Sequence, residues 1–217
     1  MAYLLFKLYG VLNWIIERVW GRLTVPREFL ELFKDAGDVS PEDMGVKGYK
    51  PYYYRRDVDG LVEDALSSGR SVIIAGRRKA GKTRMLYEAL RKLKGYRVVK
   101  IRRDKIPELS DMPPFPERSK KILVLDDVEL YLNADLHGLV GKLGGRRKVV
   151  VAATCRTESL QEVMVRFPDL LEEMGFTLIE IPELTREEAE KVAEEAGIRI
   201  EWGKFDGTIG SLMENFS

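Results

Sequence analysis

Short apolar runs alternate with amphipathic stretches along most of the chain, beginning near residue 71. The runs have the length and β-branched content of buried strands, whereas the stretches between them repeat their apolar positions every three or four residues, as helices do. The pattern predicts strands at 71–75, 96–101, 121–125, 148–154 and 176–181, and helices at 82–94, 129–143 and 157–174 with a break at Pro168. Strands separated by helices predict an α/β fold, in which a central parallel sheet is covered on both faces by helices.

The first 23 residues are a separate apolar stretch. Their polar and small positions recur every three or four residues, which predicts an amphipathic helix with a wide apolar face. The longest uncharged run, residues 8–16, has nine residues, whereas a helix that spans a membrane needs about 20. The alternatives are packing on the protein itself, docking on a protein partner, and binding to a membrane surface.

Two segments connect this helix to the alternating region. The sequence of residues 27–37 predicts a short helix, because Pro26 suits its first turn and Gly37 supplies the stop. Residues 38–50 contain Gly and Pro and predict a linker.

The C-terminal part begins with a well-marked helix. Thr185 and Glu188 have the spacing of a capping box, and Gly197 supplies the stop. No complete element is predicted after residue 201. The predicted organisation is an N-terminal amphipathic helical segment at 1–37, an α/β domain at 48–184 and a short helical piece at 185–217.

Charge is balanced over the chain, with 36 Lys and Arg against 35 Asp and Glu, but it is unevenly distributed. Residues 77–105 hold thirteen Lys and Arg and two acids. Such a block either binds the phosphates of a nucleotide or a nucleic acid, or forms an ordinary solvated basic surface. One cysteine cannot form an internal disulfide, which favours a reducing compartment such as the cytoplasm. Scarce Gln, Asn, Cys and His beside abundant Lys, Arg and Glu are typical of a thermophile.

The most specific motif directly follows the strand predicted at 71–75 and opens the next helix. Residues 76–83 match the phosphate-binding pattern G-x-x-x-x-G-K-[ST]. The glycines allow successive backbone N–H groups to converge on phosphates, and the helix dipole points to the same place. We expect Lys82 to reach the β- and γ-phosphates and the Thr83 hydroxyl to bind Mg²⁺. The expected nucleotide-binding residues here are Gly76, Arg77, Arg78, Lys79, Ala80, Gly81, Lys82, Thr83 and Arg84.

A second motif lies 43 residues beyond Thr83. The apolar strand 121–125 ends in Asp126 and Asp127, at the sheet edge where nucleotides bind in open α/β folds. We expect Asp126 to hold Mg²⁺ through water, together with Thr83. Asp127 is the expected base that orients or deprotonates the attacking water, with Glu129 as the alternative.

Further candidates follow from the topology. The strand 148–154 ends at Thr154, and Arg156 follows, so both face a γ-phosphate if this strand lies beside the Asp126 strand; otherwise Arg156 pairs with Glu158 on the surface. Three adjacent tyrosines, residues 52–54, either stack on a base or pack the sheet edge.

In this order the motifs resemble the AAA+/STAND group of P-loop ATPases, with a NACHT-like nucleotide-binding domain. The first motif corresponds to Walker A and the second to Walker B. Arg56 and Asp57 resemble the pair that introduces a helix before Walker A, and the resemblance implies that they help to bind nucleotide. Thr154 and Arg156 resemble sensor 1, and residues 181–197 resemble the start of the helical lid.

The resemblance implies an ATP-binding, ATP-hydrolysing, Mg²⁺-dependent molecular switch with a three-layer P-loop sandwich. ATP or ADP and Mg²⁺ are the expected ligands. Asp127 stands where many AAA+ enzymes have Glu, so slow turnover is expected. The alternatives are a nucleotide kinase, a DNA-handling AAA+ protein such as an initiator or helicase loader, and a partner-docking module that binds nucleotide without turnover. A second copy of the chain, nucleic acid, and a protein or membrane surface met by residues 1–23 are the partners left open.

Overall fold

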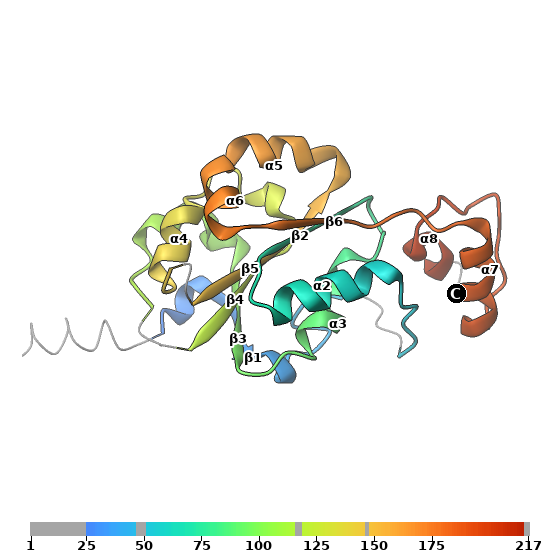
Figure 1. Ribbon diagram of the computed structural model, residues 1–217, viewed down its shortest axis with the longest axis horizontal. Helices are drawn as coiled ribbons and strands as arrows, with labels where there is room; N and C mark the ends of the chain where they lie inside the picture. Colours follow the sequence, from blue (N-terminus) through green and yellow to red (C-terminus); the bar gives the residue numbers. More distant parts are fainter. Residues whose placement is uncertain (1–24, 47–50, 116–118, 146–147, 215–217) are drawn as a thin grey trace, which may run out of the picture.

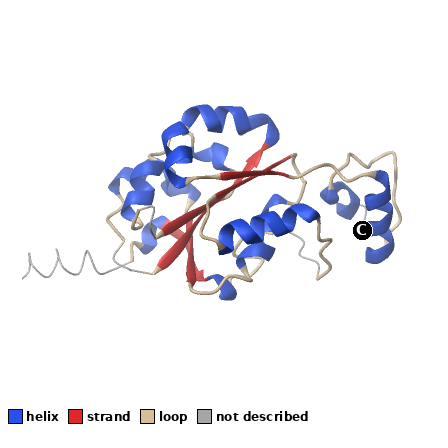
Figure 2. Cartoon of the chain, viewed as in Figure 1, coloured by secondary structure: helices blue, strands red, loops and turns tan. Residues whose placement is uncertain are grey.

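The computed structural model describes residues 25–46, 51–115, 119–145 and 148–214. The amphipathic helix predicted for residues 1–23 lies outside these ranges. None of the described helices has the length and hydropathy that crossing a membrane requires. Figures 1 and 2 show a sheet with helices on both faces and a smaller helical piece beyond one end of it.

In the described residues six strands form one sheet, and helices connect most of them. The strands are β1 (Leu30–Asp35), β2 (Val72–Gly76), β3 (Tyr96–Ile101), β4 (Lys120–Leu125), β5 (Val149–Arg156) and β6 (Thr177–Glu180). The α-helices are α2 (Asp57–Ser67), α3 (Lys82–Leu90), α4 (Leu136–Lys142), α5 (Leu160–Arg166), α6 (Pro168–Met174), α7 (Arg186–Ala196) and α8 (Ile209–Glu214). The 3-10 helices are η1 (Arg27–Phe29), η2 (Ala36–Asp38), η3 (Arg103–Asp111), η4 (Val128–Tyr131) and η5 (Thr157–Ser159).

The strand order is β1-β3-β4-β5-β2-β6, and every neighbouring pair is parallel except β1 with β3. The five strands predicted from the apolar runs are therefore confirmed, and so is the α/β sandwich with helices on both faces. Because β4 and β2 both pair with β5, the carboxyl ends of these three strands meet at one edge of the sheet. Both sequence motifs follow strands that end at this edge.

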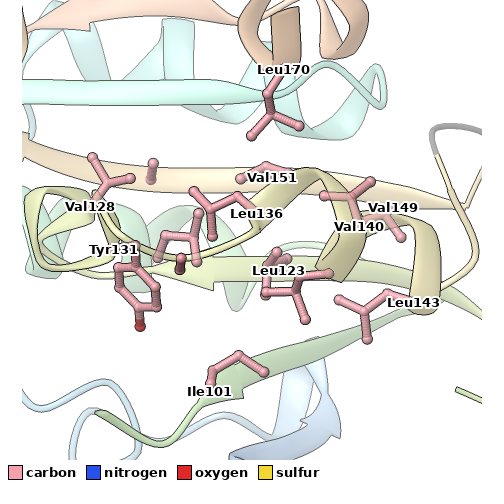
Figure 3. Close-up of a cluster of buried hydrophobic side chains, with 14 of the residues drawn as sticks. Ile101, Leu123, Val128, Tyr131, Leu136, Val140, Leu143, Val149, Val151 and Leu170 are labelled. Carbon is pink, nitrogen blue, oxygen red and sulfur yellow. The ribbon is translucent and has the colours of Figure 1, made fainter. Parts of the chain in front are cut away.

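Side-chain alternation along the strands builds one core on each face of the sheet. On β4, Leu123 and Leu125 point into the core under α4, α5 and α6, whereas Ile122 and Val124 point into the core under α2 and α3. All four are at most 1 % exposed, so both faces of this strand are buried from solvent. Figure 3 shows part of the first core, where Leu136 of α4 lies over the sheet. This burial explains why the central strands are continuous apolar runs.

The short helix predicted over 27–37 is wrong. These residues form η1 and then β1, which pairs antiparallel with β3 at the edge of the sheet. The free edge of β3 offers backbone groups that an extended segment satisfies and a helix does not, so tertiary pairing overrides the local helical pattern. Phe33 completes the strand's packing with its ring edge-to-face on Phe115, 5.2 Å between centroids.

Two other predicted segments differ from the structure. The single helix predicted at 129–143 is split into η4 and α4, and the Asp135 carboxylate caps α4 by accepting from Gly138 N at 2.8 Å. Of the predicted linker, residues 38–46 pack on the sheet, with Met44 fully buried, while 47–50 lie outside the described ranges. The domain boundaries proposed from the sequence stay predictions.

The C-terminal helices form a separate small cluster at one end of the molecule (Figure 1). The predicted capping box of α7 is confirmed, since Glu188 N donates to Thr185 Oγ1 at 3.2 Å and Thr185 N donates to Glu188 at 2.8 Å. The prediction that no complete element follows is wrong, because α8 forms after Thr208 and packs on α7 through Leu212. We call residues 185–214 the lid segment from here on.

Candidate functional site

The predicted phosphate-binding loop connects β2 to α3, and its backbone has the shape that the motif requires. Gly81 has φ +92° and Lys79 has φ +66°, so the loop turns through the left-handed region at two positions. Its lysine bridges the loop: Lys82 Nζ donates to Gly76 O at 2.9 Å and to Arg77 O at 3.0 Å. Burial holds the pKa of the Lys82 ammonium below its usual value, although nearby carboxylates act in the opposite direction. The cation is thus positioned inside the loop.

The hydroxyls of two threonines meet one carboxylate at the sheet edge. Thr83 Oγ1 and Thr154 Oγ1 each donate to Asp126 Oδ1 at 2.9 Å. Asp127 N donates to Thr154 Oγ1 at 2.8 Å. Because Thr154 is fully buried, this network fixes the ends of β4 and β5 and the start of α3 relative to one another. The structure therefore brings together the residues predicted from two separate motifs and from sensor 1.

Asp127 and Glu129 differ in where they lie. Asp127 has φ +56°, a conformation that non-glycine residues rarely adopt, and it lines the cavity next to the loop. Glu129 is largely buried, lies 3.4 Å from Arg156 Nε, and is not among the residues that line this cavity. Arg156 therefore pairs with Glu129, and not with Glu158 as in the alternative considered from the sequence. Cys155, which precedes Arg156 in β5, is fully buried, and burial raises the pKa of its thiol to about 12.

A cavity of about 940 Å³ lies over the loop. Its walls combine the phosphate-binding loop, the three tyrosines that precede α2, and one face of α8. Of the residues predicted from sequence, it is lined by Arg56, Arg78, Lys79, Ala80, Gly81, Lys82, Thr83, Arg84, Asp127 and Arg156. Those that do not line it are Gly76, Arg77, Asp57, Asp126, Thr154 and Glu129. Among these, Asp126 still reaches the site through its hydrogen bond from Thr83.

The pair Arg56 and Asp57 is split by the structure. Arg56 lines the cavity and donates to Ala80 O at 3.1 Å and to Pro182 O at 3.2 Å, so it ties the loop to the segment that leads into the lid. Asp57 is the exposed first residue of α2 and lies outside the cavity wall, whereas Asp59, 2 % exposed, is the acid that caps α2. Tyr53 donates its hydroxyl to Asp59, which raises the pKa of this tyrosine together with its burial.

Two loop cations pair with acids of the segment that follows β6. Arg77 pairs with Glu183 at 2.5 Å and donates to Asp206 O at 3.0 Å. Lys79 pairs with Glu214 of α8. Both pairs are half-exposed, so each contributes little to stability on its own.

Several cavity residues were missed from sequence. They are Gly45, Val46, Met85, Arg103, Ile209, Gly210, Met213 and Glu214. Arg103 belongs to the basic block that the sequence showed, but no spacing singled it out. No sequence pattern marked the α8 residues, because this helix has only six residues and its place depends on a contact with the loop. In that contact Gly210 N donates to Lys79 O at 3.0 Å.

The donor set suits a magnesium ion. A threonine hydroxyl and a carboxylate converge at 2.9 Å beside the loop, and Mg²⁺ in nucleotide sites takes one or two protein oxygens and completes its shell with phosphate and water. In the described residues no group of three or more His, Cys, Asp and Glu side chains could hold a metal by itself. The residues present fit a metal that is bound together with a phosphate ligand.

No protein-family model matches the sequence, and no curated protein is significantly similar to it. Solved structures are similar in fold. The Hsp104–ADP complex of S. cerevisiae is 11% identical, with a TM-score of 0.50 over 75% of this chain and 26% of that chain. The Aeropyrum pernix ORC2 protein in ADPNP–ADP complexes is 16% identical (TM-score 0.45, 75% of this chain, 57% of that chain). AMPPCP-bound DnaA from Aquifex aeolicus is 18% identical (TM-score 0.48, 70% of this chain, 56% of that chain).

The fold is that of the P-loop NTPases, a mostly parallel six-stranded sheet flanked by helices. The Hsp104–ADP complex shares this fold with the chain. The chain spans about a quarter to three fifths of the lengths of the structures named above. The STAND and NACHT subtype stays a prediction.

Proposed function

We propose that the protein is a Mg²⁺-dependent, ATP-binding and ATP-hydrolysing switch of the AAA+ type. The observation that carries this proposal is the convergence of Lys82, Thr83 and Asp126 at one edge of the sheet, where Lys82 and Thr83 follow β2, Asp126 follows β4, and both strands flank β5. A lysine, a threonine and a carboxylate in these places serve phosphate and metal together.

The phosphates would bind at the loop. Backbone N–H groups at the start of α3 and the Lys82 ammonium supply positive charge there, and the lysine exchanges its two carbonyl acceptors for phosphate oxygens. Thr83 and Asp126 would hold Mg²⁺. The bound metal would neutralise part of the charge of the phosphates. A base and ribose would lie against the tyrosines that line this cavity, Tyr52 and Tyr54.

Asp127 is the proposed base. Its carboxylate faces the cavity, whereas Glu129 is engaged with Arg156. The left-handed backbone at Asp127, fixed by the hydrogen bond from its N–H to Thr154, aims this side chain away from the course of the strand. Proton abstraction from a water at the terminal phosphate is the role that this position supports.

The switching element would be the lid segment. Its helix α8 lies on the loop itself, so a phosphate that draws Lys79 away from Glu214 removes one of the links between lid and loop. Nucleotide state would thereby alter the position of the lid.

The basic block gives little support to a DNA-handling function. Most of its members that the structure describes are paired with acids, as in Arg84–Glu88, Lys92–Glu63 and Lys100–Glu31. Paired cations release few counter-ions on binding DNA, so the salt-dependent affinity that unpaired cations give is reduced. Nucleic acid, a second copy of the chain, a membrane surface and a cytoplasmic location stay predictions.

The test is product analysis with the full chain. ATP and Mg²⁺ are incubated with the wild type and with Asp127→Asn, and ADP and phosphate are quantified. We expect slow phosphate release that the substitution abolishes while ATP binding persists. Binding without release by the wild type would leave a nucleotide-binding module without turnover, and no binding would overturn the proposal.

A further inference from the structure

Arg103 is a cation at the nucleotide cavity that no motif assigns. It opens η3, two residues after the end of β3, and β3 is the neighbour of β4 in the sheet. Its Nη2 lies 3.8 Å from Asp126 Oδ2 and 3.6 Å from Asp127 Oδ2. The topology thus places a guanidinium on the β3 side of both carboxylates, at the cavity wall.

Three other cations of the cavity wall have different partners. Arg156 lies on the β5 side and pairs with Glu129 at 3.4 Å, Lys79 pairs with Glu214, and Lys82 donates to loop carbonyls. Arg103 faces the same two carboxylates that the proposed metal and the proposed attacking water would need. Its side chain is 56% exposed, so it can rotate without unpacking a core.

Two changes would act on Arg103 when a metal–nucleotide complex binds. A divalent cation held by Thr83 and Asp126 competes with the guanidinium for Asp126 and repels it. A terminal phosphate brings negative charge to the same end of the cavity, and guanidinium binds phosphate through two parallel hydrogen bonds. The first change frees Arg103, and the second offers it a new partner.

We infer that Arg103 recognises the terminal phosphate of a nucleoside triphosphate and so distinguishes a triphosphate from a diphosphate. This inference rests on the proposed function, since it assigns a specificity role at the same cavity. Before a nucleotide binds, the guanidinium lies beside the carboxylates of Asp126 and Asp127. When a triphosphate binds, its terminal phosphate becomes the partner of the guanidinium.

A purely structural counter-ion would behave differently. If Arg103 only neutralises Asp126 and Asp127, its removal alters the site equally for both nucleotides. The ratio of triphosphate to diphosphate affinity separates the two roles, because the diphosphate lacks the group that Arg103 would bind.

The experiment is calorimetric titration of the full chain with AMPPNP and with ADP, each with Mg²⁺. Arg103→Ala is expected to weaken AMPPNP binding about tenfold, as the loss of one charge-assisted contact does, and to change ADP binding by less than about twofold. Arg103→Lys, which keeps the charge but loses the fork, should fall between the wild type and Arg103→Ala. The matched control is Arg102→Ala, which removes the adjacent arginine, one that is paired with Asp104 at 2.8 Å on the surface.

A second readout is the Mg²⁺ concentration that gives half of the metal-dependent tightening of ADP. Because the guanidinium competes with the metal for Asp126, this concentration should fall in Arg103→Ala. Equal losses for AMPPNP and ADP, or an unchanged ratio of their affinities, would overturn the inference while leaving nucleotide binding intact. Failure of the wild type to bind either nucleotide would instead overturn the proposed function.

Discussion

The sheet edge and the lid segment both contribute to the wall of the cavity over the loop, but they are held by different interactions. At the sheet edge Thr154 is fully buried, and it links Asp126 and Asp127 through hydrogen bonds of 2.8–2.9 Å. The lid has its own small cluster around Val192 and Leu212. It reaches the loop through the half-exposed pair of Lys79 with Glu214, a hydrogen bond from Arg77 to Asp206 O, and one close backbone approach at Gly210.

This difference separates what is fixed from what can move. Buried, satisfied hydrogen bonds are costly to break, whereas exposed ion pairs contribute little and exchange readily with water or another anion. We therefore expect the sheet edge, where we propose that the metal binds, to keep its geometry in every nucleotide state and the lid to respond to nucleotide.

The largest effect is expected for Asp127→Asn. If Asp127 is the base, turnover should fall by about 10²–10⁴-fold while ATP affinity stays within a few-fold of the wild type. Phosphate release and a binding titration measure the two quantities on the same preparation. Glu129→Gln is the matched comparison, and its failure to reduce turnover is expected; loss of turnover in Glu129→Gln alone would mean that Glu129 is the base.

Next in size is Lys82→Ala. Removing the loop cation should weaken ATP binding by about 100-fold, the loss of a charge-assisted contact to a multiply charged ligand. A fluorescent ATP analogue reports the affinity, and circular dichroism checks the fold. Lys94→Ala, an exposed lysine outside the cavity wall, is the control and should bind like the wild type.

Thr154→Val tests the sheet edge without a ligand. Valine keeps the shape but leaves the Asp127 N–H without its acceptor and removes one donor to Asp126, which should lower the free energy of unfolding by about 1–3 kcal/mol. Urea unfolding of the nucleotide-free chain measures it. A change below about 0.5 kcal/mol, typical of surface substitutions, would show that the edge is no more fixed than the lid.

Gly210→Ala tests the docking of α8. An added Cβ would lie 2.6 Å from Lys79 Cβ and 2.9 Å from Lys79 O, so the helix must move away from the loop. Amide hydrogen exchange of residues 209–214 should speed up, with a loss of protection of about 1–2 kcal/mol, while exchange in β4 and β5 stays unchanged. Gly203→Ala in the same segment is the control, because nothing lies within 4 Å of its added Cβ.

The smallest effect is expected for Glu214→Gln. Loss of an exposed pair should cost at most about 1 kcal/mol of lid docking, and it removes a carboxylate from the cavity wall. ATP affinity should therefore rise by a few-fold, and this gain over the wild type should shrink as salt screens the charges. A lower affinity than the wild type would show that Glu214 helps to place the nucleotide rather than opposing it.

The same contrast explains how much the sequence could predict. The sheet edge was predicted because its residues follow continuous apolar strands and because each motif has a fixed spacing, as for Lys82, Thr83 and Asp126. Neither β1 nor α8 could be predicted in this way. The first depends on the free edge of β3, and the second depends on Gly210 lying against Lys79. Arg103 could not be predicted from the sequence for the same reason, because only the pairing of β3 with β4 brings it close to Asp127.

The proposed metal site can be tested by titrating the wild type and Asp126→Asn with ATP, first in Mg²⁺ and then in EDTA. We expect one site per chain in the wild type, tightened at least about tenfold by Mg²⁺, and loss of that tightening in Asp126→Asn with metal-free affinity retained. Equal Mg²⁺ dependence in the two proteins would contradict the claim that the hydroxyl of Thr83 and the carboxylate of Asp126 form the metal site.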